Sequence, residues 1–289
     1  VGDFTLVRRR MRRFAKTSGH PLPEVDRLHA AEGLLRRLAA SPDGKRFALR
    51  GALLRRTWGG AEPGPVRVVE LAFDGTAEDV WAALQSAAMA PVPDAVRFDP
   101  HVLTVDPLPR PGDRPAVYAR VAARFAEADA VEIEVDLGPT GATDTVAFPA
   151  VLGPTDALRR QTPAAAFAER LQALVDPARV HFAPADLLEA WHIATVAQPS
   201  PGAVAQAVAD AFTHRGVSAG RLRRLLDDRF GESKSSLKSW RRHERDLGQP
   251  LPEVAEAVAA VRALVLASGI DEDETRLGQT TIPPVTDFR

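Results

Sequence analysis

The chain has 289 residues, which is enough for one large domain or two ordinary ones. Apolar residues make up 45% and charged residues 26%, as in a typical globular protein, and the formal net charge of −1 gives no global preference for polyanions. The absence of Cys excludes disulfides, thiolate metal sites and a Cys nucleophile. No apolar run approaches the roughly 20 residues that a membrane span needs. We therefore expect a cytoplasmic protein with no membrane partner.

Residues 1–22 form a basic N-terminal arm in this interpretation. Its arginines lie close together, at Arg8, Arg9, Arg10, Arg12 and Arg13. No apolar core follows them, so the segment does not have the pattern of a secretory signal. A frayed helix and a nucleic-acid contact both remain open for this arm.

The pattern of residues 23–155 predicts an α+β domain. Apolar spacing predicts helices, and alternation predicts strands. In chain order we expect a helix over 23–40, a short strand that ends at Gly51, a helix over 52–58, a strand over 66–73, a helix over 76–87, a short strand over 101–105, and an antiparallel pair over 117–123 and 131–137.

The pattern turns helical after Gly153 and stays so to residue 269. This predicts an all-α second domain over 156–269, followed by a disordered tail over 270–289. The expected helices cover 163–175, 184–196, 201–214, 221–230, 235–247 and 252–267.

Carboxylates occur on one face of two predicted strands. Glu132, Glu134 and Asp136 share one face because side chains alternate with period two, and Glu70 lies opposite Val69 on its own strand. If the two strands are neighbours, Glu70 lies near Glu134. Two carboxylates there suit magnesium, whereas the alternative is a solvated strand face.

The segment around Gly51 is typical of a phosphate-binding turn. Gly51 would let the backbone amides of Gly51 and Ala52 approach a phosphate at the start of a helix. A strand, a turn and a helix in this order are also common in α/β proteins, so a purely structural role remains open.

Other motifs are absent or weak. The sequence has no P-loop, no G-x-G-x-x-G after a strand, no H-E-x-x-H and no G-x-S-x-G, and its seven His lack metal-ligand spacing. The helical half is locally basic around Trp240, which is typical of solvated helix faces. Contact with phosphate, with Trp240 stacking on a base, is the other interpretation.

Several runs together resemble the AbiEii-type nucleotidyltransferase toxin family of type IV toxin–antitoxin systems. The resemblance covers about residues 25–268, and its motifs occur in the order that the family shows. The matching runs are Glu32–Pro42, Arg46–Leu54, Ile133–Gly138, Phe148–Leu152, Phe167–Val175 and Asp186–Trp191.

The resemblance implies a nucleotidyltransferase-like mixed sheet with flanking helices and an added helical domain, in a bacterial protein. It implies transfer of a nucleotide from an NTP with Mg²⁺, an RNA acceptor such as tRNA reached through the basic helical domain, and an antitoxin or another protein as partner. Its site residues would be Glu70 and Glu134 as metal ligands and catalytic acids, Arg170 and Asp186 as further catalytic residues, and Gly51, Ala52 and Arg67 as nucleotide contacts.

The sequence departs from the family at these acids. In the ungapped match Val68 replaces the first motif Asp and Glu70 the second; shifted by two, Glu70 is first and Ala72 second. Either way one acid of the pair is missing. The third acid becomes Glu134, and the motif Lys becomes Arg170, which cannot act as a base at neutral pH.

Three interpretations follow from the incomplete acid set. The protein is a pseudoenzyme that keeps the fold as a binding or regulatory module, an active but divergent nucleotidyltransferase, or an unrelated α+β protein. Glu132 or Asp136 could substitute for the missing acid, because both lie on the face that carries Glu134.

Overall fold

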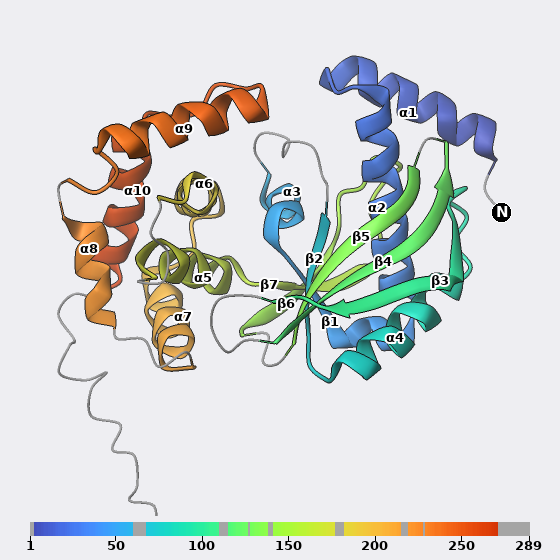
Figure 1. The fold of residues 1–289 in the computed structure, drawn as a ribbon, viewed down its shortest axis with the longest axis horizontal. Coiled ribbons are helices and arrows are strands. Elements are labelled where there is room, and N and C mark those ends of the chain that lie inside the picture. Colours follow the sequence, from blue (N-terminus) through green and yellow to red (C-terminus); the bar gives the residue numbers. More distant parts are fainter. Residues whose placement is uncertain are drawn as a thin grey trace, which may run out of the picture. The chain divides into compact units, whose positions relative to one another are not determined.

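A computed structural model describes residues 3–59, 68–109, 115–126, 128–137, 141–176, 182–214, 219–227 and 229–270. The chain divides into two compact units, Val1–Thr162 and Pro163–Arg289 (Figure 1). Each unit is described by itself below.

The first unit contains a seven-stranded sheet in the order β3-β4-β5-β2-β1-β7-β6. β2 runs parallel to β5 and β1 parallel to β7, whereas the other neighbours are antiparallel, so the sheet is mixed. The strands are β1 (Phe47–Arg50), β2 (Val68–Phe73), β3 (Arg97–Pro107), β4 (Ala116–Phe125), β5 (Ala128–Leu137), β6 (Thr143–Ala147) and β7 (Ala157–Gln161).

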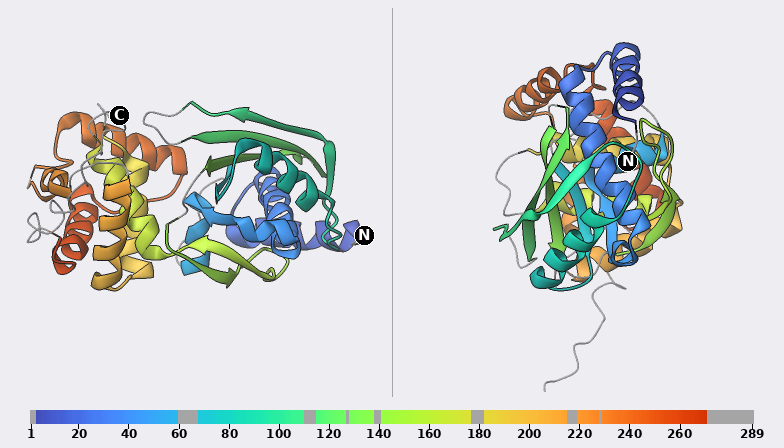
Figure 2. Two further views of the ribbon diagram at one scale, coloured as in Figure 1. Left: turned by 90° about the horizontal axis from the view of Figure 1, so that it is seen from below. Right: turned by 90° about the vertical axis from the view of Figure 1, so that its right-hand side faces the viewer.

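The helices of this unit are α1 (Phe4–Ser18), α2 (Leu22–Ala40), α3 (Arg55–Trp58) and α4 (Ala77–Met89), with 3-10 turns η1 (Pro42–Arg46) and η2 (Gly51–Leu54). In the left view of Figure 2, α2 and α4 lie beneath strands β3 to β5. The inward side chains of the sheet are apolar and buried, as at Leu71, Phe73 and Ile133. The opposite face carries polar side chains, among them the half-buried Glu70 and Glu134.

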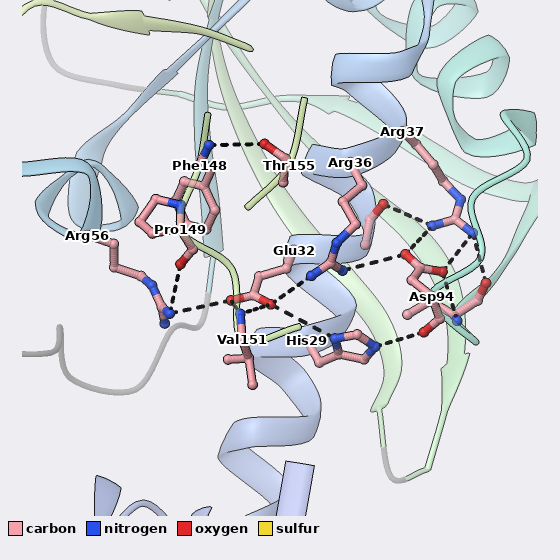
Figure 3. A network of polar contacts seen from close by, with 12 residues as sticks. His29, Glu32, Arg36, Arg37, Arg56, Asp94, Phe148, Pro149, Val151 and Thr155 are labelled. Carbon is pink, nitrogen blue, oxygen red and sulfur yellow. Dashed lines mark hydrogen bonds and ion pairs between the residues drawn. The ribbon is translucent and has the colours of Figure 1, made fainter. Parts of the chain in front are cut away.

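A buried polar network fixes α2 in this unit (Figure 3). Glu32 is fully buried, accepts hydrogen bonds from the amide of Val151 at 3.0 Å, and pairs with Arg36 at 3.2 Å and with Arg56 at 3.6 Å. Asp94 is paired with Arg37 at 2.9 Å. Buried charges are tolerated when they are paired in this way, and these pairs tie α2 to α3 and to two loops.

The second unit is helical, as expected. Its elements are α5 (Pro163–Val175), α6 (Pro184–His192), a π-helix η3 (Ile193–Ala197), α7 (Pro201–His214), η4 (Ala219–Leu222), α8 (Arg223–Leu226), α9 (Lys234–Leu247) and α10 (Val254–Ala267). The indole of Trp240 is buried and donates its N–H to the carbonyl of Pro252 at 3.0 Å. The interpretation that Trp240 stacks on a base is therefore wrong.

The structure also corrects several expected elements. The helical pattern after Gly153 is wrong over 157–161, where β7 pairs with β1 and β6, so the helical unit begins at Pro163. The strand expected over 101–105 is the longer β3, and β6 was not predicted. The helix expected over 52–58 is the 3-10 turn η2 followed by the single α-turn α3.

The basic arm expected over residues 1–22 contains a regular helix that packs on α2. In α1, Val7 and Met11 are buried, and Arg8 pairs with the buried Asp26. Arg67 lies outside the described residues, as does the expected tail beyond Ile270. Within the described residues, no helix has the length and apolar character needed to cross a bilayer.

Candidate functional site

Four polar residues lie side by side across four strands of the sheet. By register, Arg50 on β1 is opposite Glu70 on β2, Glu70 is opposite Glu134 on β5, and Glu134 is opposite Tyr118 on β4. Residues at the same level of a sheet point to the same face. We call these four residues the polar row.

The predicted neighbourhood of Glu70 and Glu134 is confirmed. β2 and β5 are hydrogen-bonded parallel strands, and the two glutamates are direct partners in the register. Neighbouring strands lie about 4.8 Å apart, so both side chains leave the backbone side by side. Both residues are half-buried, unlike the fully buried Ile133 between the β5 acids.

The carboxylate of Glu70 lies against the turn after β1. It accepts a hydrogen bond from the amide of Ala52 at 3.3 Å. Gly51 has φ +68, and a Cβ at this position would overlap the Glu70 carboxylate. Glycine is therefore required here because the Glu70 side chain approaches the backbone closely. The expected reason was the approach of a phosphate.

The expected phosphate-binding helix is shorter than the sequence indicated. η2 and α3 contain four residues each. A macrodipole needs several turns of aligned peptide units, so this segment offers an anion little beyond its individual amides. One of those amides, that of Ala52, already has a carboxylate partner.

The neighbouring rows of the sheet hold the remaining acids. Val68 is opposite Glu132, so an apolar side chain stands where the ungapped match expects the first acid. On the other side Ala72 is opposite Asp136. Asp136 is buried and forms an ion pair with Arg50 of the polar row. Arginine thus neutralises one of the two acids that could have substituted.

Tyr118 is a member of the polar row that the sequence did not indicate. Burial raises the pKa of its hydroxyl, and the charge and a hydrogen bond of Glu132 and the charge of Glu134 raise it further, against an opposing effect of Arg120. A phenol that stays neutral can donate a hydrogen bond to a carboxylate. The sequence showed the alternation of residues 117–123, which include Tyr118. It did not show that Tyr118 is the register partner of Glu134.

The two glutamates of the polar row have the oxygen ligands that Mg²⁺ prefers. Within the described residues, no group of three or more His, Asp or Glu side chains is arranged to hold a metal ion. If a magnesium ion bound here, Glu70 and Glu134 would be its two protein ligands, and water or phosphate oxygens would take its other positions.

Arg170 and Asp186 lie together in the helical unit. The guanidinium of Arg170 on α5 contacts Asp186 at 3.0 Å and Glu189 at 2.8 Å, both on α6. All three side chains are largely buried. These contacts tie α5 to α6. The catalytic role that the resemblance implies for Arg170 and Asp186 stays a prediction.

Comparison with known proteins supports the predicted fold. A scan against protein-family models gives no match, and a search of curated proteins gives none either. Among solved structures, the chain is similar to MenT4, a nucleotidyltransferase toxin from Mycobacterium tuberculosis H37Rv, with a TM-score of 0.58 and 18% sequence identity. The match covers 95% of this chain and 92% of that one. The chain therefore has the α+β fold of a nucleotidyltransferase toxin.

Proposed function

We propose that this chain is a divergent relative of nucleotidyltransferase toxins that serves as a binding or regulatory module and has lost most or all nucleotide transfer. The proposal rests on the fold shared with MenT4 together with the state of the acids around the polar row. It places the protein in a bacterial cytoplasm, with an antitoxin or another protein as partner.

The observation that carries the proposal is the position of the Glu70 carboxylate. It is hydrogen-bonded to the amide of Ala52, in the place where a nucleotide phosphate would meet the turn. A carboxylate there repels a phosphate unless a cation stands between them. With Val68 at the neighbouring level, the chain lacks the carboxylate that would help to hold that cation.

The missing acid matters because nucleotide transfer depends on positioning and on charge neutralisation. A bound magnesium ion supplies Lewis-acid stabilisation worth several kcal/mol, and two protein carboxylates hold it less firmly than three. The ion pair between Arg50 and Asp136 removes another candidate ligand. These features support the loss of activity in the presence of an intact fold.

RNA is the partner that the helical unit favours. α9 carries exposed Lys234, Lys238, Arg241 and Arg245 at spacings that place them along one face of the helix. Such a stripe neutralises backbone phosphates without reading sequence. We propose tRNA or another structured RNA as the ligand of this face.

Retained activity is the alternative, and the register of Glu70 and Glu134 favours it. Two carboxylates at one level of adjacent strands suffice for a single magnesium ion bound to an NTP. In that case Glu70 and Glu134 are the metal ligands, and the acceptor is tRNA or another nucleic acid.

Transfer of label from radiolabelled NTPs tests the two possibilities. Wild type and Glu70→Ala are incubated with each of the four NTPs, Mg²⁺ or Mn²⁺, and a pool of total RNA and protein. We expect both to stay at background. Turnover by wild type that is abolished in Glu70→Ala would establish the alternative.

A further inference from the structure

A hollow in the first unit lies away from the polar row. It is formed by the first turn of α1, the loop before β3 and the β4–β5 hairpin, and has a volume of about 440 Å³. Its lining includes Phe4, Arg97, Arg124, Phe125 and Asp129. This volume is within the range of sites that hold small organic ligands.

Two arginines face each other across the β3–β4 ladder at this hollow. Arg97 and Arg124 are direct partners in the register, and both are exposed. Neither has an ion pair with any residue that the structure describes. Like charges placed opposite each other destabilise a sheet, so this pair carries a cost that an anion bound between the guanidinium groups would offset.

An aromatic ring stands beside the two arginines. The side chain of Phe4 is 49% exposed, and its ring lies 5.6 Å from that of the buried Phe125, centroid to centroid. Phe125 in turn contacts His29 of α2 at 4.5 Å. Phe4 is thus held in place while half of its surface remains open, as in a platform for stacking a planar group.

The exposed face of α1, whose first turn borders the hollow, is also positively charged. Arg9, Arg12, Arg13 and Lys16 are exposed, recur at helical spacing, and have no ion pair within the described part of the chain. The helix is about 22 Å long. Val7 and Met11 are buried, and the large apolar side chains that α1 exposes, Phe4 at 49% and Leu6 at 38%, both lie in its first turn. The exposed apolar area is therefore confined to one turn, unlike the continuous apolar face of a helix that lies on a membrane.

We propose that the hollow and the cationic face of α1 bind single-stranded nucleic acid. One base stacks on Phe4, one phosphate lies between Arg97 and Arg124, and the following phosphates run along α1. Asp129 at the rim contributes one negative charge, so the two arginines still give the lining of the hollow a net positive charge. The N-terminus of α1 is not the binding element, because the side chain of Asp3 already accepts from the amides of Thr5 and Leu6.

This surface is separate from the proposed function. Arg124 lies six residues beyond Tyr118 on β4, roughly 20 Å along the strand. The inference requires neither nucleotide transfer nor the α9 face. Its failure is therefore distinguishable from the failure of the proposed function.

The test is binding of a fluorescein-labelled 12-nucleotide single-stranded RNA to the full chain, followed by fluorescence anisotropy at several salt concentrations. We expect Phe4→Ala to bind about tenfold more weakly and Phe4→Trp to bind like wild type, because a larger ring preserves stacking. We expect Arg97→Ala/Arg124→Ala to weaken binding and to reduce the salt slope by about 0.7, because one phosphate contact is lost.

Two controls distinguish binding at this surface from nonspecific attraction of RNA to positive charge elsewhere on the protein. Lys45→Ala removes an exposed cation elsewhere in the same unit and should leave binding unchanged. Lys238→Ala/Arg241→Ala tests the α9 face and should leave the effect of Phe4→Ala intact. Far-ultraviolet circular dichroism checks that each variant is folded.

Several results would overturn the inference. Equal affinity of wild type, Phe4→Ala and Arg97→Ala/Arg124→Ala would do so. Equal weakening by Phe4→Ala and Phe4→Trp would show that no base stacks there. Binding of anionic vesicles or of an acidic protein through these residues, without binding of RNA, would replace nucleic acid as the partner.

Discussion

Tyr118 is the only tyrosine of the chain, so its hydroxyl is a specific reporter of the polar row. Its neighbours across the sheet are acids, and it is partly buried. Burial and the negative charges of Glu132 and Glu134 both oppose formation of the phenolate, which raises its pKa. An absorbance titration therefore reads the charge at the site directly.

We predict that Tyr118 in wild type ionises above the ordinary pKa of about 10. Glu132→Gln removes a negative charge beside the hydroxyl, so it should lower the pKa, and Glu134→Gln should lower it by less. Absorbance near 295 nm as a function of pH measures the midpoint. The matched control is Glu24→Gln on α2; an identical midpoint in all four proteins would contradict the described contacts.

Gly51 is the second residue whose surroundings make a sharp prediction. Gly51→Ala adds the cost of a left-handed residue, about 1–2 kcal/mol, and an overlap with the Glu70 carboxylate. The matched control is Gly19→Ala, whose position is left-handed with φ +76 and has no atom within 4 Å of the new Cβ.

Urea unfolding measures both substitutions. We expect Gly51→Ala to lower the free energy of unfolding by clearly more than Gly19→Ala does. In the background of Glu70→Ala, which removes the overlapping carboxylate, the excess should largely disappear. If the two glycine variants are equally destabilised in wild type, the carboxylate does not lie against this turn.

At the scale of elements, α2 is held by buried ion pairs as well as by apolar packing. Glu32 connects it to α3 through Arg56 and to the loop after β6 through the amide of Val151 (Figure 3). Removing one partner of a buried ion pair leaves the other charge unpaired, which typically costs about 3–5 kcal/mol.

We therefore predict that Glu32→Ala lowers the free energy of unfolding by about 3–5 kcal/mol. Glu24→Ala, on the same helix, removes a partly exposed contact with His20 and should cost less than about 1 kcal/mol. Chemical denaturation of both variants gives the comparison. A loss of less than about 1 kcal/mol in Glu32→Ala would contradict a stabilising role of the network.

Some features of the strands could be predicted from the sequence, and others could not. The alternation of Val131 to Leu137 fixed which acids share a face, and the pairing of this strand with 117–123 was confirmed. The level of Tyr118 and the pairing of β2 with β5 depend on the β4–β5 turn and on crossovers, which alternation does not encode. β6 and β7 were missed because each has five residues, with arginines in β7 and polar residues in β6.

At the scale of the whole molecule, the order of motifs predicted the fold, and the likeness to MenT4 confirms it. The pair formed by Arg50 and Asp136 was not predicted, because its partners lie on β1 and β5, which are separated by β2, and only the assembled sheet defines this order. Loss of transfer remains a proposal that rests on a few side chains in an otherwise retained fold.

Val68 offers the most direct test of that proposal. Val68→Asp puts a carboxylate at the level of Glu132, beside Glu70, where the ungapped family match has its first acid. A third carboxylate should allow firmer binding of magnesium and partial recovery of transfer. The measurement is label transfer from the four NTPs by wild type, Val68→Asp and Val68→Asn side by side. The account predicts background transfer by wild type and Val68→Asn, with turnover only in Val68→Asp; efficient transfer by wild type that Val68→Asp does not increase would contradict it.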